Sequence, residues 1–217
     1  MGGAAQAGAA QAQPFMTTVA TVERLAEAGD WTALVSTCED AELDLVHDDL
    51  EAAASAQLYA AQLLGHLLLR ELEAARFVWK RAPAAAQAHA EVSGAWAVGK
   101  ALWRRDTTAA RAALTAGSWT SKAASTLASA LERRVEEEEW DTIARAFTVV
   151  SPETLAARLG LSAAAAAAAA QQRGWRLEEG TYRPVAPPPA TKPGPGEDAL
   201  AQLTEYVAHL TAEVGAA

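Results

Sequence analysis

The chain has 217 residues, of which 51% are hydrophobic, so it is long enough to bury one large core or two small ones. Its 27 acidic residues against 18 basic ones give a formal net charge of −9, which disfavours attraction to nucleic acid or to anionic lipid. The single cysteine, Cys38, excludes an intrachain disulfide, and the four histidines have no metal-binding spacing. We therefore expect a soluble protein of the nucleus and cytoplasm, without cofactor or metal, that binds neither nucleic acid, membrane nor small molecule.

The first part of the chain is predicted to be a disordered tail followed by helices. Residues 1–16 are mostly Ala, Gly and Gln, which offer too little bulk to offset the entropy cost of ordering. From residue 17 to about residue 45, apolar residues recur at helical spacing on both sides of Gly29, which indicates a helical hairpin. Residues 50–69 are apolar on most sides and predict a buried helix.

An internal repeat extends the helical pattern. The segment from Glu71 to Ala82 aligns with the segment from Asp106 to Gly117 at an offset of 35 residues. This offset is close to the period of tetratricopeptide-like helix pairs, in which each pair covers the apolar face of the next. We therefore predict a mainly α protein with a helical-repeat domain over residues 17–140.

One stretch in this domain is similar to a nucleotide-binding loop. Residues 94–101 read GAWAVGKA, and Ala101 stands where the phosphate-binding pattern G-x-x-x-x-G-K-[ST] has its magnesium-binding hydroxyl. The preceding residues are poor strand formers, although such a loop must follow a strand. Steps of four, three and four instead relate Val92, Trp96, Gly99 and Trp103. We interpret the stretch as one packing face of a helix.

A longer helix is predicted from about Ser121 to about Val150. It contains the sequence ERRVEEEEW, and we interpret its glutamates as a solvated face. The domain boundary is placed within this helix, so that residues 141–185 form the next subdomain.

Residues 141–185 have the pattern of a winged helix. Ser151-Pro152 begins a short helix that ends near Gly160, and Ser162 begins a second helix with eight consecutive alanines. An alternating segment interrupted by EEG follows and predicts a small β-hairpin, the only β-structure that we expect. Such folds often place their second helix in the DNA major groove, but alanine side chains cannot reach base edges. We therefore expect the second helix and the free hairpin edge to contact another protein.

The last part of the chain is predicted to be a linker and a separate helix. Residues 186–197 are rich in proline and form a semi-rigid linker, and residues 198–213 have an apolar helical stripe. This helix can enter a bundle of partner helices, and the alternative that it folds back on the winged helix stays open. The expected partner-interface residues are Leu200, Leu203, Tyr206, Val207, Leu210, Trp175 and Tyr182.

No catalytic residue is predicted. Cys38 has a conceivable partner in His47 by spacing alone, but a cysteine on a helix face is more often a small packing residue. Five acidic residues could attract a cation, but they lack the glycine and the residue order of a calcium loop. We interpret them as an exposed acidic turn: Asp40, Glu42, Asp44, Asp48 and Asp49.

Three motifs resemble a known family. They are AARFVWKRAP at residues 74–83, GAWAVGKALWRRD at residues 94–106 and LAQLTEYVAHL at residues 200–210. In the same order, they look like the smallest PCI-domain subunits of the COP-nine signalosome, the subunit-eight family. The similarity runs from about Val19 to Leu210.

The resemblance implies a non-catalytic scaffold with helical repeats, a winged helix that contacts other winged helices, and a last helix in a shared bundle. It implies the other signalosome subunits as partners and cullin–RING ubiquitin ligases as indirect ones. The complex removes the ubiquitin-like NEDD modifier from those ligases through a zinc isopeptidase in another subunit. Small PCI subunits of the proteasome lid or of a translation initiation factor complex are alternatives, as is a winged-helix nucleic-acid regulator. The alanine-rich tail and polyalanine helix depart from the family.

Overall fold

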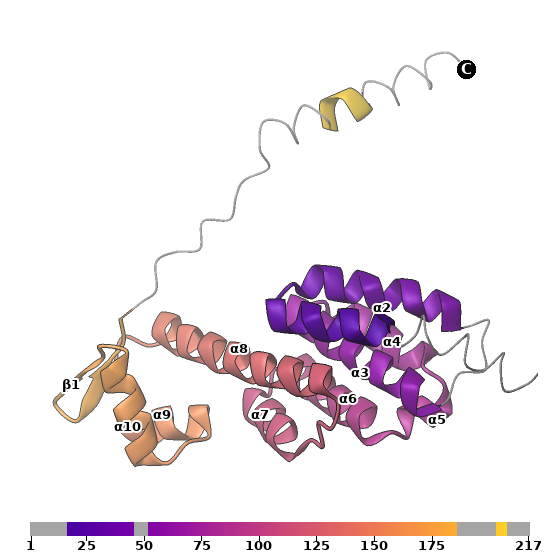
Figure 1. The fold of residues 1–217 in the computed structure, drawn as a ribbon. Coiled ribbons are helices and arrows are strands. Elements are labelled where there is room, and N and C mark those ends of the chain that lie inside the picture. The colour runs from indigo at the N-terminus through magenta and orange to yellow at the C-terminus, as the bar shows by residue number, and fades with distance from the viewer. Residues whose placement is uncertain (1–16, 46–51, 186–202, 208–217) are drawn as a thin grey trace, which may run out of the picture. The chain divides into compact units, whose positions relative to one another are not determined.

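The computed structural model describes residues 17–45, 52–185 and 203–207, and most of these residues are helical (Figure 1). The prediction of a mainly α protein is confirmed. The chain divides into two compact units, residues 1–185 and residues 186–217. The predicted tail, linker and most of the last helix lie outside the described residues.

The first unit is built around a buried central helix, α3 (Ala52–Leu69). It packs against α2, α4, α5, α6 and α8, which explains why its apolar residues are not confined to one face. Its contact with α2 (Trp31–Leu45) is close, because a Cβ added at Gly65 would lie 2.8 Å from Cγ2 of Val35. The helix over residues 17–28 precedes α2, and the turn between them lies at Gly29, where φ is +75°.

Two turns between helices have the same conformation, and they are separated by the offset of the sequence repeat. Arg70, after α3, and Arg105, after α6, both have positive φ, 67° and 58°. In each turn, the following residue donates its N–H to the carbonyl five residues earlier, at 2.9 Å and 3.0 Å. The short helices of the array are α4 (Leu72–Arg81), α5 (Ala84–Gln87), α6 (Ala90–Trp103) and α7 (Thr107–Ala116). The offset of 35 residues therefore corresponds to a repeated turn as well as a repeated sequence.

The stretch that is similar to a phosphate loop lies inside α6, so no loop exists there. Gly99 is buried, as predicted, and a Cβ there would lie 3.5 Å from Leu67 of α3. The predicted packing face is partly wrong, because Trp96 is half-buried and Trp103 is 49% exposed. The buried face runs through Val92, Ala95, Val98 and Leu102. The two tryptophans lie on a neighbouring face, toward α4.

The long helix α8 (Lys122–Ala146) connects two hydrophobic cores. Figure 1 shows it extending from the helical array to α9, α10 and the hairpin. Its first half packs into the first core through residues such as Leu127 and Leu131, whereas Trp140 and Ile143 belong to the second core. It ends four residues before the predicted position, because the backbone becomes extended and Val150 pairs with Tyr182 instead.

The glutamates of α8 do not all form a solvated face. Glu139 is 6% exposed and lies next to Trp140, where α8 passes from the first core to the second. The guanidinium of Arg158 approaches its carboxylate at 3.7 Å. Glu137 is exposed, as predicted. The helical period places residue 139 on the buried side because Val135 and Ile143, four residues away in each direction, are also buried.

The second core is covered by two short helices and a hairpin. Helix α9 (Pro152–Leu159) and helix α10 (Ala163–Gln172) begin at Ser151 and Ser162, whose hydroxyls cap the helices. Gly160 has φ +61° and ends α9. Strands β1 (Arg176–Glu178) and β2 (Thr181–Arg183) are antiparallel and are the only named strands in the described ranges.

Candidate partner interface

Two of the residues that the sequence predicts as partner contacts lie in the second core. Trp175 is 5% exposed, and its ring meets the ring of Trp140 edge to face, with centroids 5.0 Å apart. Tyr182 is 3% exposed, and its backbone N–H and carbonyl pair with Val150 at 2.8 Å and 2.9 Å. The sequence predicted these residues in a partner interface, but within the described residues both side chains are buried. They are needed inside because the alanines of α10 supply little packing volume.

The hairpin instead exposes aliphatic side chains that the sequence interpretation missed. Val149, Leu177 and Val185 are 48%, 56% and 61% exposed. Leu177 lies on β1 opposite Tyr182, and Val149 precedes the residue that pairs with β2. In the sequence RLE, Leu177 stands between two charged residues, and this pattern could have indicated its exposed position.

One edge of the hairpin is open to pairing. On one side β2 pairs with β1, and on the other side it forms a bridge through Tyr182 to Val150. Within the described residues, β1 pairs only with β2, and all three of its residues are exposed. An exposed strand edge of this kind can accept a strand from another chain.

The surface of α10 is small and apolar. Ala166 and Ala170 are buried against the second core, whereas Ala164, Ala165 and Ala168 are exposed. Methyl side chains allow another backbone to approach closely and lose no rotamer freedom on contact. These residues cannot reach base edges, so the helix fits protein contact better than sequence-specific DNA contact.

The second unit contributes a short helical segment over residues 203–207. Leu203, Tyr206 and Val207 are 59%, 66% and 56% exposed, and helical spacing places all three on one face. Leu200 and Leu210, the other predicted interface residues, lie outside the described residues.

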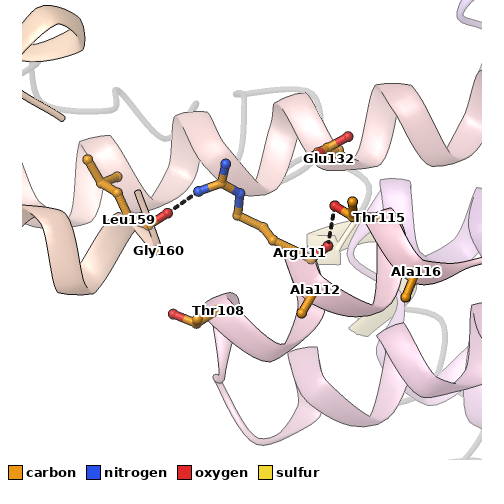
Figure 2. Close-up of a pocket in the computed structure, with 8 residues that line it drawn as sticks. All are labelled: Thr108, Arg111, Ala112, Thr115, Ala116, Glu132, Leu159 and Gly160. Atoms are coloured by element: carbon orange, nitrogen blue, oxygen red, sulfur yellow. Dashed lines mark hydrogen bonds between the residues drawn. The ribbon is translucent and has the colours of Figure 1, made fainter. Parts of the chain in front are cut away.

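A pocket of about 440 Å³ lies between the array and α9 (Figure 2). Arg111 of α7 extends across it and donates a hydrogen bond to the carbonyl of Leu159, at the end of α9. Its guanidinium also lies 3.9 Å from the carboxylate of Glu136 on α8. A cation at a helix C-terminus interacts favourably with the helix dipole. We therefore interpret the pocket as a junction that fastens α9 to the array.

The predicted acidic turn is only partly a surface feature. Glu42 is 9% exposed, and its carboxylate accepts two hydrogen bonds from Arg81, at 2.6 Å and 2.8 Å, and one from Gln62 at 3.2 Å. It is therefore a paired, internal carboxylate, which corrects the interpretation for this residue. Asp48 and Asp49 lie outside the described residues.

Cys38 has the environment of a packing residue. It is fully buried, and burial, followed by the negative charges of Glu39 and Glu42, raises the pKa of its thiol to about 12. A thiol in that state is protonated at neutral pH and a poor nucleophile. His47 lies outside the described residues. Across residues 17–45, 52–185 and 203–207, no His, Cys, Asp and Glu side chains gather into a metal-binding group.

Among the described helices, none combines the length and the apolar composition that crossing a lipid bilayer requires. The described residues thus form a mainly helical fold that ends in two short helices and a hairpin, with exposed apolar side chains near the hairpin and on the second unit. Exposed apolar side chains of this kind are typical of the class of proteins that contact other proteins.

Comparison with known proteins identifies the family. The model of the CSN8/PSMD8/EIF3K family matches residues 53–194, and the chain belongs to this family. The COP9 signalosome complex subunit 8 of Xenopus tropicalis is 32% identical over 80% of this chain and 89% of its own length. The subunit of the same name from Danio rerio is 34% identical over 72% and 84%. That from Arabidopsis thaliana is 28% identical over 70% and 78%.

Proposed function

We propose that this protein is a non-catalytic scaffold subunit of a COP9 signalosome, which removes the NEDD modifier from cullin–RING ubiquitin ligases. The observation that carries the proposal is the match, over most of both chains, to vertebrate and plant proteins that share the name COP9 signalosome complex subunit 8. Its partners are the other subunits of that complex, and it acts in the nucleus and cytoplasm. The family also includes the small proteasome-lid and initiation-factor subunits, so identification of the partners distinguishes these assemblies.

The finer architecture belongs to the same proposal. We interpret residues 17–140 as a tetratricopeptide-like array, residues 141–185 as a winged helix and residues 198–213 as a bundle helix. The repeated turns at Arg70 and Arg105 support the first interpretation. The order helix, turn, helix and hairpin supports the second.

Two surfaces are suited to assembly. The open edge of β1, with Leu177 beside it, can pair with a strand of a neighbouring subunit, and the alanine surface of α10 can lie close to that neighbour. The apolar face of the second unit, at Leu203 and Val207, can insert into a bundle of partner helices. Neither surface requires a reacting group, because the function is to hold other chains in place.

The experiment tests the last helix. We expect the double substitution Leu203→Asp and Val207→Asp to release the subunit from its complex, because two carboxylates cannot be buried in an apolar bundle without partners. The measurement is co-purification of stoichiometric partners with a tagged subunit from the native source. The melting temperature of the free subunit should hardly change, because both side chains are exposed.

A matched control is Glu205→Lys, which changes the charge on the opposite face of the same helix. This variant should keep its partners. Full co-purification of the Leu203 and Val207 variant would contradict the bundle role. Recovery of proteasome-lid or initiation-factor subunits would contradict the signalosome assignment.

A further inference from the structure

Helices α4 and α6 form a further surface, in addition to the hairpin and the last helix. It carries three tryptophans and several cations, and we call it the aromatic–basic face: Arg76, Trp79, Trp96, Lys100, Trp103 and Arg104. Trp79 packs partly against the first core and Trp96 is half-buried, but Trp103 is exposed. An exposed tryptophan in the middle of such a cluster indicates a contact with another molecule.

The aromatic rings of this face lie close to one another and to Arg76. Trp79 and Trp96 stack with their centroids 5.5 Å apart and their planes at 10°. Trp103 is 49% exposed at the end of α6, and the guanidinium of Arg76 lies 5.9 Å from its ring centroid. Such an arrangement offers a rigid apolar surface at a low entropy cost, which is typical of residues that dominate binding.

The face is also hollowed. A groove of about 350 Å³ is lined by Arg76, Trp96, Lys100, Trp103 and Arg104. This volume suits one or two side chains of a bound segment and lies near the lower end of the range for ligand sites. Its walls combine indole rings with long side chains that end in positive charge.

The positive charge of the groove is mostly unpaired inside the chain. Arg76 forms an ion pair with Glu73 at 3.6 Å, but both side chains are well exposed. For Lys100 and Arg104, no salt bridge is present among the described residues. Nearby Arg81 is different, because it is paired with Glu42. A local excess of cations in a protein of net charge −9 is complementary to an acidic ligand.

We propose that the aromatic–basic face binds an acidic segment of a partner protein that carries an aromatic or leucine side chain. The apolar side chain occupies the groove against Trp96 and Trp103, and flanking carboxylates pair with Lys100 and Arg104. Arginine next to tryptophan adds a planar group that can bind a carboxylate with two hydrogen bonds.

Single-stranded nucleic acid fits the face less well. Base stacking requires open ring faces, but Trp79 and Trp96 stack on each other and Arg76 lies over Trp103. The overall charge of −9 also repels a chain that has one phosphate per nucleotide, whereas a short segment with a few carboxylates is repelled less.

The test is selection of short random peptides on the full chain, followed by binding measurements on the selected peptides by fluorescence anisotropy. The selected sequences should contain Asp or Glu beside an aromatic residue or leucine. Affinity should fall about 30-fold for Trp103→Ala and at least about tenfold for the pair Lys100→Glu and Arg104→Glu. Replacement of the peptide acids by amides, or an increase in salt from about 50 mM to about 500 mM, should also weaken binding.

The matched control reverses two exposed cations elsewhere, Arg24→Glu and Arg133→Glu, and should leave the affinity unchanged. The proposal is overturned if the selected peptides lack acidic residues, or if they bind the Lys100 and Arg104 variant as tightly as the unmodified chain. It is also overturned if labelled oligothymidylate binds the full chain and Trp103→Ala abolishes that binding. Because the readout is peptide affinity, its failure leaves the proposed signalosome role standing.

Discussion

The two cores of the first unit are built from different side chains. The first core collects mostly leucines and alanines, from the helix over residues 17–28 through to α8, around the buried helix α3. The second core is smaller and combines Trp140, Trp175 and Tyr182 with a few aliphatic side chains, while α10 contributes only alanines. The first core therefore shares its burial among many side chains, whereas the second depends on a few large aromatic and aliphatic ones.

This difference explains why the second core needs additional fastening. Arg111 reaches from α7 to the carbonyl of Leu159, and Arg158 reaches from α9 to Glu139 of α8. Arg173 places its guanidinium 4.6 Å from the ring centroid of Trp140. A subdomain with a small core therefore keeps its position through contacts to the preceding helices. Loss of any one aromatic ring should strongly lower the stability of such a small core.

The largest effect is expected for Trp140→Ala. The substitution should cost about 3–5 kcal/mol within the second core, because it leaves a cavity beside Trp175. Hydrogen exchange should then show lost protection in α9, α10 and the hairpin, while α3 keeps its protection. Equal loss of protection in α3 would contradict the division into two separately stable cores.

A smaller effect is expected for Glu91→Gln in the first core. Glu91 is 1% exposed, and its carboxylate accepts hydrogen bonds from the backbone N–H groups of Thr120 and Ser121 at 2.5 Å and 2.6 Å. Glutamine keeps one oxygen that can accept from both N–H groups, but it loses the negative charge that strengthens these bonds, and its NH2 group replaces the oxygen that accepts from the Ser121 hydroxyl. The substitution should therefore cost about 2–3 kcal/mol at neutral pH. Denaturant unfolding of both proteins measures the difference, and Glu137→Gln on the exposed side of α8 is the matched control.

The same carboxylate predicts a pH dependence. Burial by itself raises the pKa of Glu91, but the hydrogen bonds from Ser121 and Thr120 outweigh burial and the net pKa is lowered. A depressed pKa in the folded state stabilises the fold at any pH above the pKa of an unfolded glutamate. That contribution disappears as the pH falls through the lower pKa of the folded protein. The difference between the original chain and Glu91→Gln should therefore shrink on going from about pH 7 to about pH 3; a constant difference would contradict this explanation.

The smallest effects are expected for a pair of helical glycines. Gly65→Ala should destabilise the protein by about 1–2 kcal/mol, because the new methyl group would lie 2.8 Å from a rigid valine side chain, Val35. Gly94→Ala meets only Trp119 at 3.4 Å, an ordinary contact, and should gain about 0.5–1 kcal/mol from higher helix propensity. Thermal unfolding compares the two variants, and a gain at Gly65 would show that α2 and α3 are less tightly packed than described.

Much of the chain's local structure could be predicted from its residues. Helical spacing predicted the central helix, and the serines before α9 and α10 marked their first residues because a hydroxyl caps free backbone N–H groups. Glycines with positive φ ended helices as expected, for example Gly160. The end of α8 was misplaced, because pairing of Val150 with Tyr182 is a contact between distant residues that local spacing does not encode.

The candidate interface was harder to predict. Trp175 and Tyr182 were expected in a partner interface, but their side chains lie in the second core. Trp103 was expected in a packing face, but α4 and α6 meet so that it remains half exposed. The repeat spacing alone could not distinguish these outcomes, because burial depends on which neighbour covers each face.

The sequence by itself determined most of the helices, their serine caps, the repeat offset and the family, since these depend on residue type and spacing along the chain. Only the tertiary structure decided which aromatic rings fill the second core and which stand on α4 and α6. It also decided that Glu42, Glu91 and Glu139 are internal carboxylates. The residues that cover a carboxylate and pair with it come from distant segments of the chain, so their positions depend on the tertiary structure.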